Sequence, residues 1–221
     1  GAYDHGTFGL IERVNDDGHS SNNNQPRLRY WKIRAQRTVL ATGMIERPLV
    51  FENNDLPGIM LTSGVRSYVN RYAVLPGKLA TIYTNNDTAY ETALALSLAG
   101  ASVEILDTRT TVPDHCQAMI QTQNIRVRSG CTVISARGGK HIEQLSFSSQ
   151  HNNANIETLK TDLLCLSGGW TPTLHLWSQR GQKPVYNHQV GCFVPDVEAD
   201  NIRCVGACAG HFTSADVMHH A

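Results

Sequence analysis

The sequence lacks several features that would point to particular classes of protein. Its 221 residues carry 19 basic and 19 acidic side chains, so no net charge would attract nucleic acid or an anionic membrane surface. It has no run of about 18 apolar residues that could span a membrane. Residues 1–20 have neither the basic start nor the apolar stretch of a signal peptide. We therefore expect a cytoplasmic protein that binds a small molecule, with no nucleic-acid or membrane partner.

The six cysteines lack the paired CxxC spacing of zinc ribbons, iron–sulfur sites and dithiol redox centres. This absence argues against a stand-alone disulfide reductase. The spacing of Cys204 and Cys208 would place two thiols on one helical face, but the glycines around them favour a strand running into a turn. We expect these cysteines to be buried apolar residues, with no metal or redox role. No Ser/His/Asp or paired-carboxylate arrangement is recognisable, so we assign no catalytic residue.

The residues that are present are typical of a soluble globular chain. Hydrophobic residues make up 41% of the sequence, charged residues 17%, and the 18 glycines allow many tight turns. This length allows one or two domains.

The first third of the chain reads as a hairpin, a strand and a helix. Residues 7–14 and 28–35 alternate in polarity and flank the polar run 15–26, which predicts a β-hairpin with a long loop. Residues 37–42 form a short apolar strand that runs into Gly43. Residues 61–74 have helical spacing, with Thr62 or Ser63 as the cap and Pro76-Gly77 as the stop.

A complete βαβ unit follows, with a buried strand at 79–84, a helix at 89–99 and a second strand at 102–107. Next come a helical segment near 113–122 and short strands at 125–130, 131–139 and 141–149. After the polar run 148–155, residues 158–169 predict a strand that returns to the earlier, outer sheet.

This nested order predicts an α/β protein with the FAD/NAD(P)-binding, Rossmann-like fold. Residues 1–77 and 159–221 would form an incomplete outer dinucleotide-binding domain. Residues 78–158 would form an inserted, NAD(P)-binding-like βαβ domain. A chain that leaves one α/β domain, builds another and returns follows the plan of flavoprotein disulfide reductase relatives.

The loop of the βαβ unit departs from the glycine-rich GxGxxG pattern that holds a dinucleotide diphosphate. Residues 84–89 occupy the six positions, and only Ala89 is an accepted substitute. Side chains at Thr84 and Asn86 would crowd a diphosphate, and the carboxylate of Asp87 would oppose its charge. In favour of a site, Asn85 and Asn86 with the helix N-terminus could hold an anion.

Two residues at the end of the second strand keep the pattern of a nucleotide site. Asp107 occupies the place of the acid that binds a ribose, and Arg109 follows two residues later. Two interpretations are open: residues 84–109 hold a nucleotide in an altered mode, or the unit keeps its fold without a ligand. The altered loop favours the second.

A further candidate cofactor edge lies in the outer domain. The Ala41-Thr42-Gly43 triplet follows a buried strand, where such folds bring the backbone near the cofactor. Residues 201–211 form a second strand and turn before a helix expected from Thr213. Gly206 and Gly210 in this turn would let the helix N-terminus face a pyrophosphate. The alternative is that these are ordinary turn glycines.

Residues 37–60, 63–96 and 99–109 together resemble the alpha subunit of heterotetrameric sarcosine oxidase. The motifs that carry the resemblance are Glu46-Arg47-Pro48, Asn54-Asp55-x-Pro57-Gly58-Ile59-Met60, Asn70-Arg71-Tyr72, Pro76-Gly77-Lys78 and Thr84-Asn85-Asn86-Asp87. The resemblance covers nearly the whole chain and is weakest at 110–160.

The resemblance implies part of an enzyme complex that oxidatively demethylates sarcosine to glycine, forms hydrogen peroxide and passes a one-carbon unit to tetrahydrofolate. It implies that the alpha subunit holds NAD, whereas FAD and FMN belong to the partner beta subunit or its interface. The other subunits of the complex would be the protein partners. The family's first βαβ unit and its folate domain are expected to lie outside these 221 residues. We therefore expect the isolated chain to be inactive and to bind NAD weakly or not at all.

Two alternatives stay open at this stage. The chain can be the corresponding subunit of a related amine, opine or proline dehydrogenase, or of a hydrogen cyanide synthase. It can also be a noncatalytic scaffold domain that binds partner chains and no nucleotide.

Overall fold

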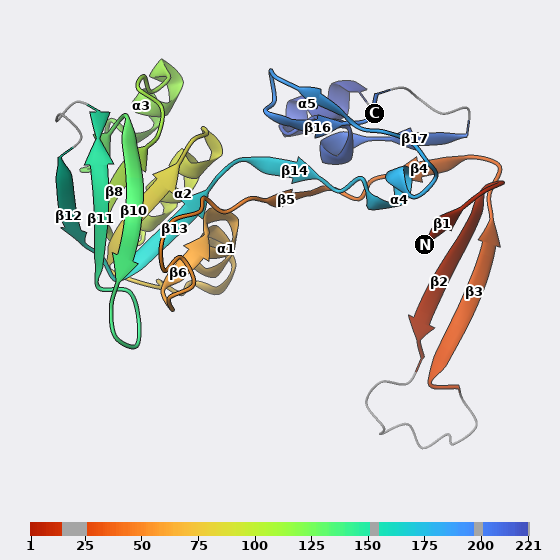
Figure 1. The fold of residues 1–221 in the computed structure, drawn as a ribbon, viewed down its shortest axis with the longest axis horizontal. Coiled ribbons are helices and arrows are strands. Elements are labelled where there is room, and N and C mark those ends of the chain that lie inside the picture. Colours follow the sequence, from red (N-terminus) through yellow and green to blue (C-terminus); the bar gives the residue numbers. More distant parts are fainter. Residues whose placement is uncertain (15–25, 151–154, 197–200, 221) are drawn as a thin grey trace. The chain divides into compact units, whose positions relative to one another are not determined.

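The computed structural model describes residues 1–14, 26–150, 155–196 and 201–220. Within it the chain forms two compact units. Unit 1 comprises residues 1–45 and 170–221, and unit 2 comprises residues 46–169 (Figure 1). Residues 15–25 of the predicted hairpin loop and 151–154 of the predicted polar run fall outside the described residues.

Unit 2 is built on a five-stranded parallel sheet in the order β6-β13-β7-β8-β9. Its strands are β6 (Ile59–Leu61), β13 (Leu163–Ser167), β7 (Leu79–Thr84), β8 (Ser102–Asp107) and β9 (Arg126–Arg128). All five residues of β13 and five of the six in β7 are buried. Such nearly continuous apolar strands suit a parallel sheet because both of its faces are covered.

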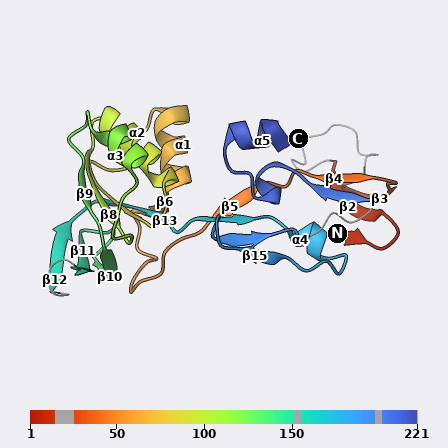
Figure 2. The same cartoon turned by 90° about the horizontal axis from the view of Figure 1, so that it is seen from above.

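Three helices cover one face of this sheet, and an antiparallel sheet covers the other (Figure 2). The helices are α1 (Thr62–Tyr72), α2 (Thr88–Leu98) and α3 (Asp114–Ile120). The antiparallel strands are β10 (Cys131–Arg137), β11 (Gln144–Ser149) and β12 (Ile156–Lys160). The two faces hold separate cores, one around Tyr90 and Ile105 and the other around Leu106 and Phe147.

Unit 1 is assembled from short sheets. Its strands are β1 (Ala2–Tyr3), β2 (Thr7–Arg13), β3 (Leu28–Arg34), β4 (Thr38–Leu40), β5 (Met44–Glu46), β14 (Trp170–Pro172), β15 (Val185–Asn187), β16 (Cys192–Val194) and β17 (Ile202–Cys204). It also has the helices α4 (His175–Ser178) and α5 (Ser214–His220) and the 3-10 helix η2 (Gly206–Ala209). A small core packs Trp177 against Leu40, Ile202 and Cys208.

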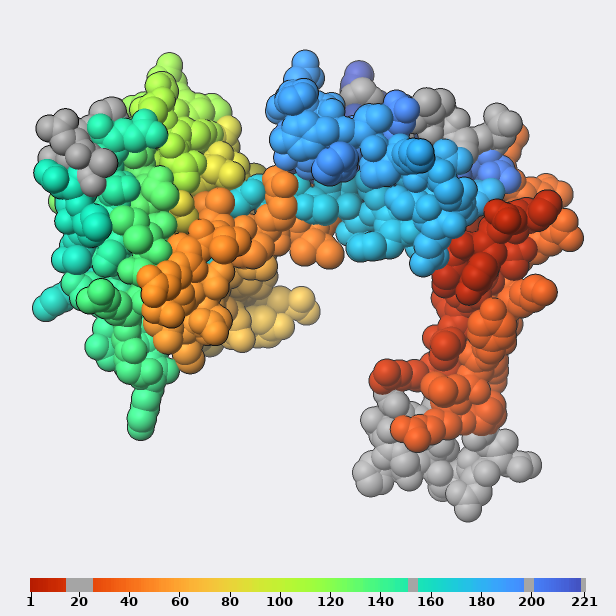
Figure 3. Space-filling view, viewed as in Figure 1, coloured from red at the N-terminus to blue at the C-terminus, as the bar shows by residue number. Residues whose placement is uncertain are grey.

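The predicted hairpin is present as β2 and β3, paired antiparallel from Thr7↔Arg34 to Arg13↔Leu28. It forms an arm of unit 1 (red and orange in Figure 3). Apolar side chains on this arm are exposed, including Ile11 and Tyr30 at 67% and 64% of their surface. None of the helices in the described part of the chain has the length and apolarity that crossing a membrane requires.

The predicted βαβ unit is present, with β7, α2 and β8 within one residue of the expected bounds. The strand predicted at 158–169 is two strands, β12 and β13. The return to the outer sheet predicted there is wrong, because β13 lies between β6 and β7 within the parallel sheet of unit 2. The compact unit also extends beyond 78–158 on both sides, since β6 pairs with β13 and α1 packs on α2.

The first helix of unit 2 begins as predicted but is capped differently. Neither Thr62 nor Ser63 caps it; the buried Glu46 carboxylate accepts hydrogen bonds from the Thr62 hydroxyl and from the Ser63 backbone N–H at 2.8 Å. An anionic group at this end also suits the helix dipole. The helix ends at Tyr72, where Ala73 has a left-handed φ of 52°, and so stops before Pro76-Gly77.

Candidate functional site

The loop between β7 and α2 is closed by its own side chains. The Asn86 side-chain amide donates to the backbone oxygen and the hydroxyl of Ser167, both at 3.0 Å. Its oxygen accepts from the Thr88 backbone N–H at 3.2 Å and from the Thr88 hydroxyl at 2.7 Å. The Asn86 side chain therefore satisfies a helix N-terminal N–H that a dinucleotide fold offers to a phosphate.

The backbone N–H groups of Asn85 and Asn86 are also engaged. The Asn86 backbone N–H donates to the Thr84 hydroxyl at 3.1 Å, and the Asn85 backbone N–H donates to the Ser167 oxygen at 3.3 Å. The Asn85 side chain is exposed and accepts from the Asn86 amide at 3.1 Å. Ser167 lies at the end of β13, so an interior strand of the sheet holds the loop in place.

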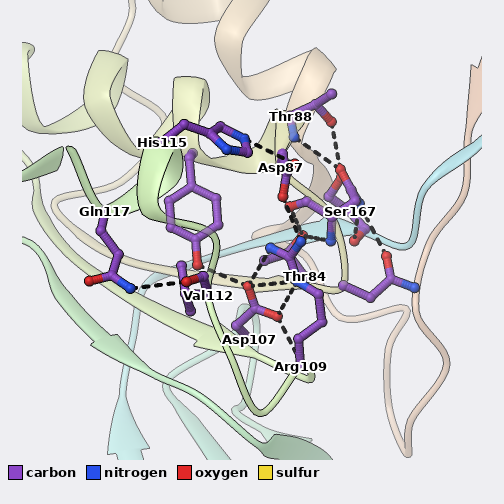
Figure 4. Close-up of polar contacts among 12 residues, drawn as sticks. Thr84, Asp87, Thr88, Asp107, Arg109, Val112, His115, Gln117 and Ser167 are labelled. Carbon is purple, nitrogen blue, oxygen red and sulfur yellow. Dashed lines mark hydrogen bonds and ion pairs between the residues drawn. The ribbon is translucent and has the colours of Figure 1, made fainter. Parts of the chain in front are cut away.

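Asp107 lies at the end of β8 and has no exposed surface. One of its oxygens accepts from the Arg109 backbone N–H at 2.9 Å (Figure 4). The other accepts from the Tyr90 hydroxyl at 2.9 Å and from the Arg109 guanidinium at 2.8 Å. Burial, together with the charge and hydrogen bond of Asp107, raises the pKa of Tyr90. The acid predicted to bind a ribose thus forms a buried ion pair.

Arg109 links this buried acid to the loop. Its Nη1 atom lies 2.5 Å from Asp87 Oδ1, at the start of α2 (Figure 4). Burial alone would lower the pKa of Arg109, but the hydrogen bonds to Asp107 and Asp87 raise it. Burial acts to raise the pKa of Asp87, and the contacts with Arg109 and Cys116 lower it on balance. Of the predicted residues of unit 2, Asp107 and Arg109 are therefore brought together and joined to Asp87, whereas Asn85 and Asn86 contact each other, Ser167 and Thr88.

Sequence reasoning missed two neighbours of Asp87 on α3. His115 Nε2 lies 3.1 Å from Asp87 Oδ2, and burial followed by the charge of Asp87 raises the pKa of the Cys116 thiol to about 12. Ligand atoms of Asp87, His115 and Cys116 lie within 4.8 Å of one another, as in a metal site. Both oxygens of Asp87 already have partners, Arg109 at Oδ1 and His115 at Oδ2, so we assign no metal there. No local spacing could have indicated this group, because α3 follows the loop by almost 30 residues.

This closed arrangement predicts unequal roles for the two neighbouring asparagines. Asn86→Ala removes the hydrogen bonds to Ser167 and Thr88 and is expected to lower the free energy of unfolding by about 0.5–2 kcal/mol, the usual cost of losing a helix cap. Asn85→Ala removes one exposed hydrogen bond and serves as the control, with an expected change below about 0.5 kcal/mol. Urea denaturation measures both, and equal losses would contradict this account of the loop.

The predicted cofactor edge of unit 1 is also brought together. The Thr42 hydroxyl lies 3.1 Å from the Cys208 sulfur, which joins the end of β4 to η2. Gly43, Gly206 and Gly210 all have left-handed φ angles, of 72°, 65° and 91°. A Cβ at Gly210 would lie 2.8 Å from Val194 Cγ1, whereas a Cβ at Gly43 would meet nothing within 4 Å. The helix expected from Thr213 begins one residue later, as α5, and η2 precedes it.

Solved structures show the class of fold. A thioredoxin reductase from T. acidophilum matches 86% of this chain and 64% of its own, with a TM-score of 0.69 and 14% identity. An L-proline dehydrogenase from P. horikoshii matches 81% of this chain and 31% of its own, with a TM-score of 0.57 and 22% identity. The fold is therefore that of FAD/NAD(P)-binding oxidoreductases, as predicted.

Sequence comparison with curated proteins identifies more specific relatives than the solved structures do. The chain is 36% identical to the sarcosine oxidase subunit alpha of Corynebacterium sp. (strain P-1) over 99% of its length, and 35% identical to that of Rhizobium meliloti (strain 1021) over 95%. These findings confirm the resemblance predicted from the motifs. The chain covers 23% and 20% of those two proteins. No family model matches the chain.

Proposed function

We propose that this chain is a segment of the alpha subunit of a sarcosine oxidase complex, which oxidatively demethylates sarcosine to glycine and forms hydrogen peroxide. The observation that carries the proposal is the 36% identity to such a subunit over 99% of the chain. The chain would contribute NAD-pocket surfaces and contacts with the other subunits of the complex. No side chain is assigned to the amine-oxidising step.

We place the NAD contact of this segment in unit 1. The left-handed glycines Gly206 and Gly210 keep the backbone near η2 free of Cβ atoms, and Gly43 has open space on its Cβ side. Thr42, beside them, donates its hydroxyl to the Thr173 backbone oxygen at 2.7 Å, so it would shape this edge while the glycine backbone meets the dinucleotide. A dinucleotide held here would supply hydride-transfer chemistry. FAD and FMN are assigned to the partner subunit.

We also propose a cytoplasmic location. The six cysteines are all free thiols, as is usual for proteins of a reducing compartment.

We propose that unit 2 keeps the dinucleotide-binding fold without a nucleotide of its own. Its residues do not fit a diphosphate, because Asn86 occupies the Thr88 N–H and Asp87 brings a negative charge to the start of α2. Asp107 is fully buried in its ion pair with Arg109. These contacts support a structural role for unit 2, as expected of a scaffold domain that binds no nucleotide.

Purification of the full-length protein that contains this chain, together with its bound subunits, tests the proposed reaction. Oxygen consumption and peroxide formation are expected with sarcosine at a kcat/KM at least about tenfold above that for proline or an opine, since one differing group in a fitted site commonly gives this discrimination. The N-methyl group of sarcosine is the chemical difference under test, and glycine is the matched control because it lacks that group. A higher kcat/KM for proline or for an opine would instead assign the chain to a subunit of one of the related dehydrogenases. If the intact complex oxidised none of these substrates, the oxidase proposal would be rejected and the scaffold domain would remain.

A further inference from the structure

One face of the β2–β3 hairpin has an apolar centre that the rest of unit 1 leaves exposed. Ile11 lies opposite Tyr30 in the register of the two strands, and Leu28 lies two residues before Tyr30 on the same face. Ile11, Tyr30 and Leu28 expose 67%, 64% and 54% of their surface. Large apolar residues gathered in this way on one face are typical of a contact surface, unlike apolar residues scattered singly.

The Tyr30 side chain lies over Gly9, on the neighbouring strand. A Cβ built at Gly9 would lie 2.6 Å from the Tyr30 hydroxyl oxygen and 3.3 Å from the nearest ring carbons. The absence of a side chain at Gly9 therefore lets the ring lie close against β2. Because this contact already restricts the ring, covering it with a partner would cost little conformational entropy.

The charged residues on the face of Tyr30 are all basic. The register places three cations there: Arg13, Lys32 and Arg34. Lys32 and Arg34 lie on one side of the Ile11–Tyr30 pair along the hairpin, and Arg13 lies on the other side. Glu12, the one acidic residue of these two strands, lies on the opposite face, where it pairs with Arg29 at 3.1 Å. The apolar centre thus has cations at both ends and no carboxylate from either strand.

We propose that this face of β2 and β3 binds another protein subunit of the complex, through a surface on that subunit with an apolar centre and a rim of Asp or Glu carboxylates. The inference rests on the proposed function, because it takes the partner from the proposed complex. Aromatic residues and arginine are enriched in such interfaces. A protein partner is favoured over nucleic acid or a membrane, because an apolar centre separates the cations and the whole sequence has no net charge.

Binding would also supply packing that the hairpin lacks by itself. All seven residues of β3 are exposed, and β1 pairs with β2 only at Ala2 and Tyr3. An antiparallel ribbon with so little packing is only marginally stable in water. In the full-length protein that contains this chain, we expect the β3 amides to exchange with deuterium at least about tenfold more slowly when the other subunits are bound.

Subunit binding by the full-length protein tests the role of the apolar centre. Tyr30→Ser is expected to weaken the affinity for the other purified subunits at least about thirtyfold, the usual loss at a tyrosine that anchors an interface. Tyr72→Ser is the matched control, because Tyr72 is 61% exposed and lies on α1 of unit 2. Its expected change is below about threefold. If Tyr30→Ser bound the other subunits within about threefold of the unsubstituted protein, the inference would be overturned.

Lys32→Glu tests the charge of the partner and leaves the apolar centre and the Tyr30–Gly9 contact in place. We expect association to slow about tenfold at low salt, with a smaller difference at high salt, as for a charge at the rim of an interface. Lys140→Glu makes the same change of charge at an exposed residue of unit 2 and is expected to have little effect. Equal slowing by the two variants would contradict an acidic rim that faces the hairpin.

These binding measurements need no turnover, so they separate the inference from the proposed reaction. Weaker binding by Tyr30→Ser, in a complex that does not oxidise sarcosine, would support the contact face and reject the reaction. Unchanged binding in a complex that oxidises sarcosine would do the reverse. Vesicles that contain phosphatidylserine are a further probe. Binding of the full-length protein to them, abolished by Tyr30→Ser, would assign the face to a membrane and overturn the subunit contact.

Discussion

Arg109→Met is expected to lower the free energy of unfolding of unit 2 by about 3–5 kcal/mol, because it leaves a buried carboxylate without its cation. Asp107 has no exposed surface, and its ion-pair partner Arg109 has only 27% of its side chain exposed. Tyr90 would remain as a neutral donor to the carboxylate. Methionine keeps most of the volume of the arginine stem, so the lost charge dominates the change.

Arg126→Met is the matched control for this substitution. Arg126 lies 3.8 Å from Glu104 with 68% of its side chain exposed, so its loss is expected to cost less than about 1 kcal/mol. Amide hydrogen exchange of β7 and β8 reports on unit 2 without interference from unit 1. Equal protection of these amides in the two variants would show that the Asp107–Arg109 pair does not stabilise the unit.

Phe147→Ala is expected to lower the free energy of unfolding of unit 2 by about 3–5 kcal/mol, through lost burial and a cavity. Phe147 lies on β11 with no exposed surface, in the core between the antiparallel sheet and the parallel sheet. The Arg128 guanidinium lies 5.2 Å from the centre of its ring, a contact that the substitution also removes. Urea denaturation, followed by the same amides, measures the loss.

Ile156→Ala on the neighbouring β12 is the control, since Ile156 is 66% exposed. Its expected change is below about 0.5 kcal/mol. If Phe147→Ala were no more damaging than this control, the antiparallel sheet would not be part of the core of unit 2.

The local structure of unit 2 could be predicted where one short segment contains the whole signal. The apolar strand 79–84, the helix after it and the strand 102–107 carry their own periodicity, and the structure confirms them. The place of β13 could not be predicted. Its residues are apolar on both faces, which suits a central strand of either predicted sheet, and only its pairing with β6 and β7 decides between them.

The candidate sites show the same division. Residues 84–89 could be recognised as an altered glycine loop because the six positions are contiguous. The partners that close this loop, Ser167 and Arg109, come from the ends of β13 and from beyond β8, so no spacing reveals them. Likewise, the glycines near Cys204 and Cys208 correctly indicated a turn, but the contact between Thr42 and Cys208 joins residues 166 positions apart, so no spacing reveals it.

Titration of the 221-residue chain with NAD by calorimetry tests most directly whether the side chains of unit 2 have replaced its nucleotide. We expect a Kd of about 1 mM or weaker. A site that has lost three hydrogen bonds to the NAD diphosphate, each contributing about 1.4 kcal/mol, has its affinity lowered about a thousandfold, from micromolar to millimolar. We expect any residual binding to disappear in Gly206→Val and to persist in Asn86→Ala. Submicromolar NAD binding that survives Gly206→Val and is lost in Asn86→Ala would contradict the account.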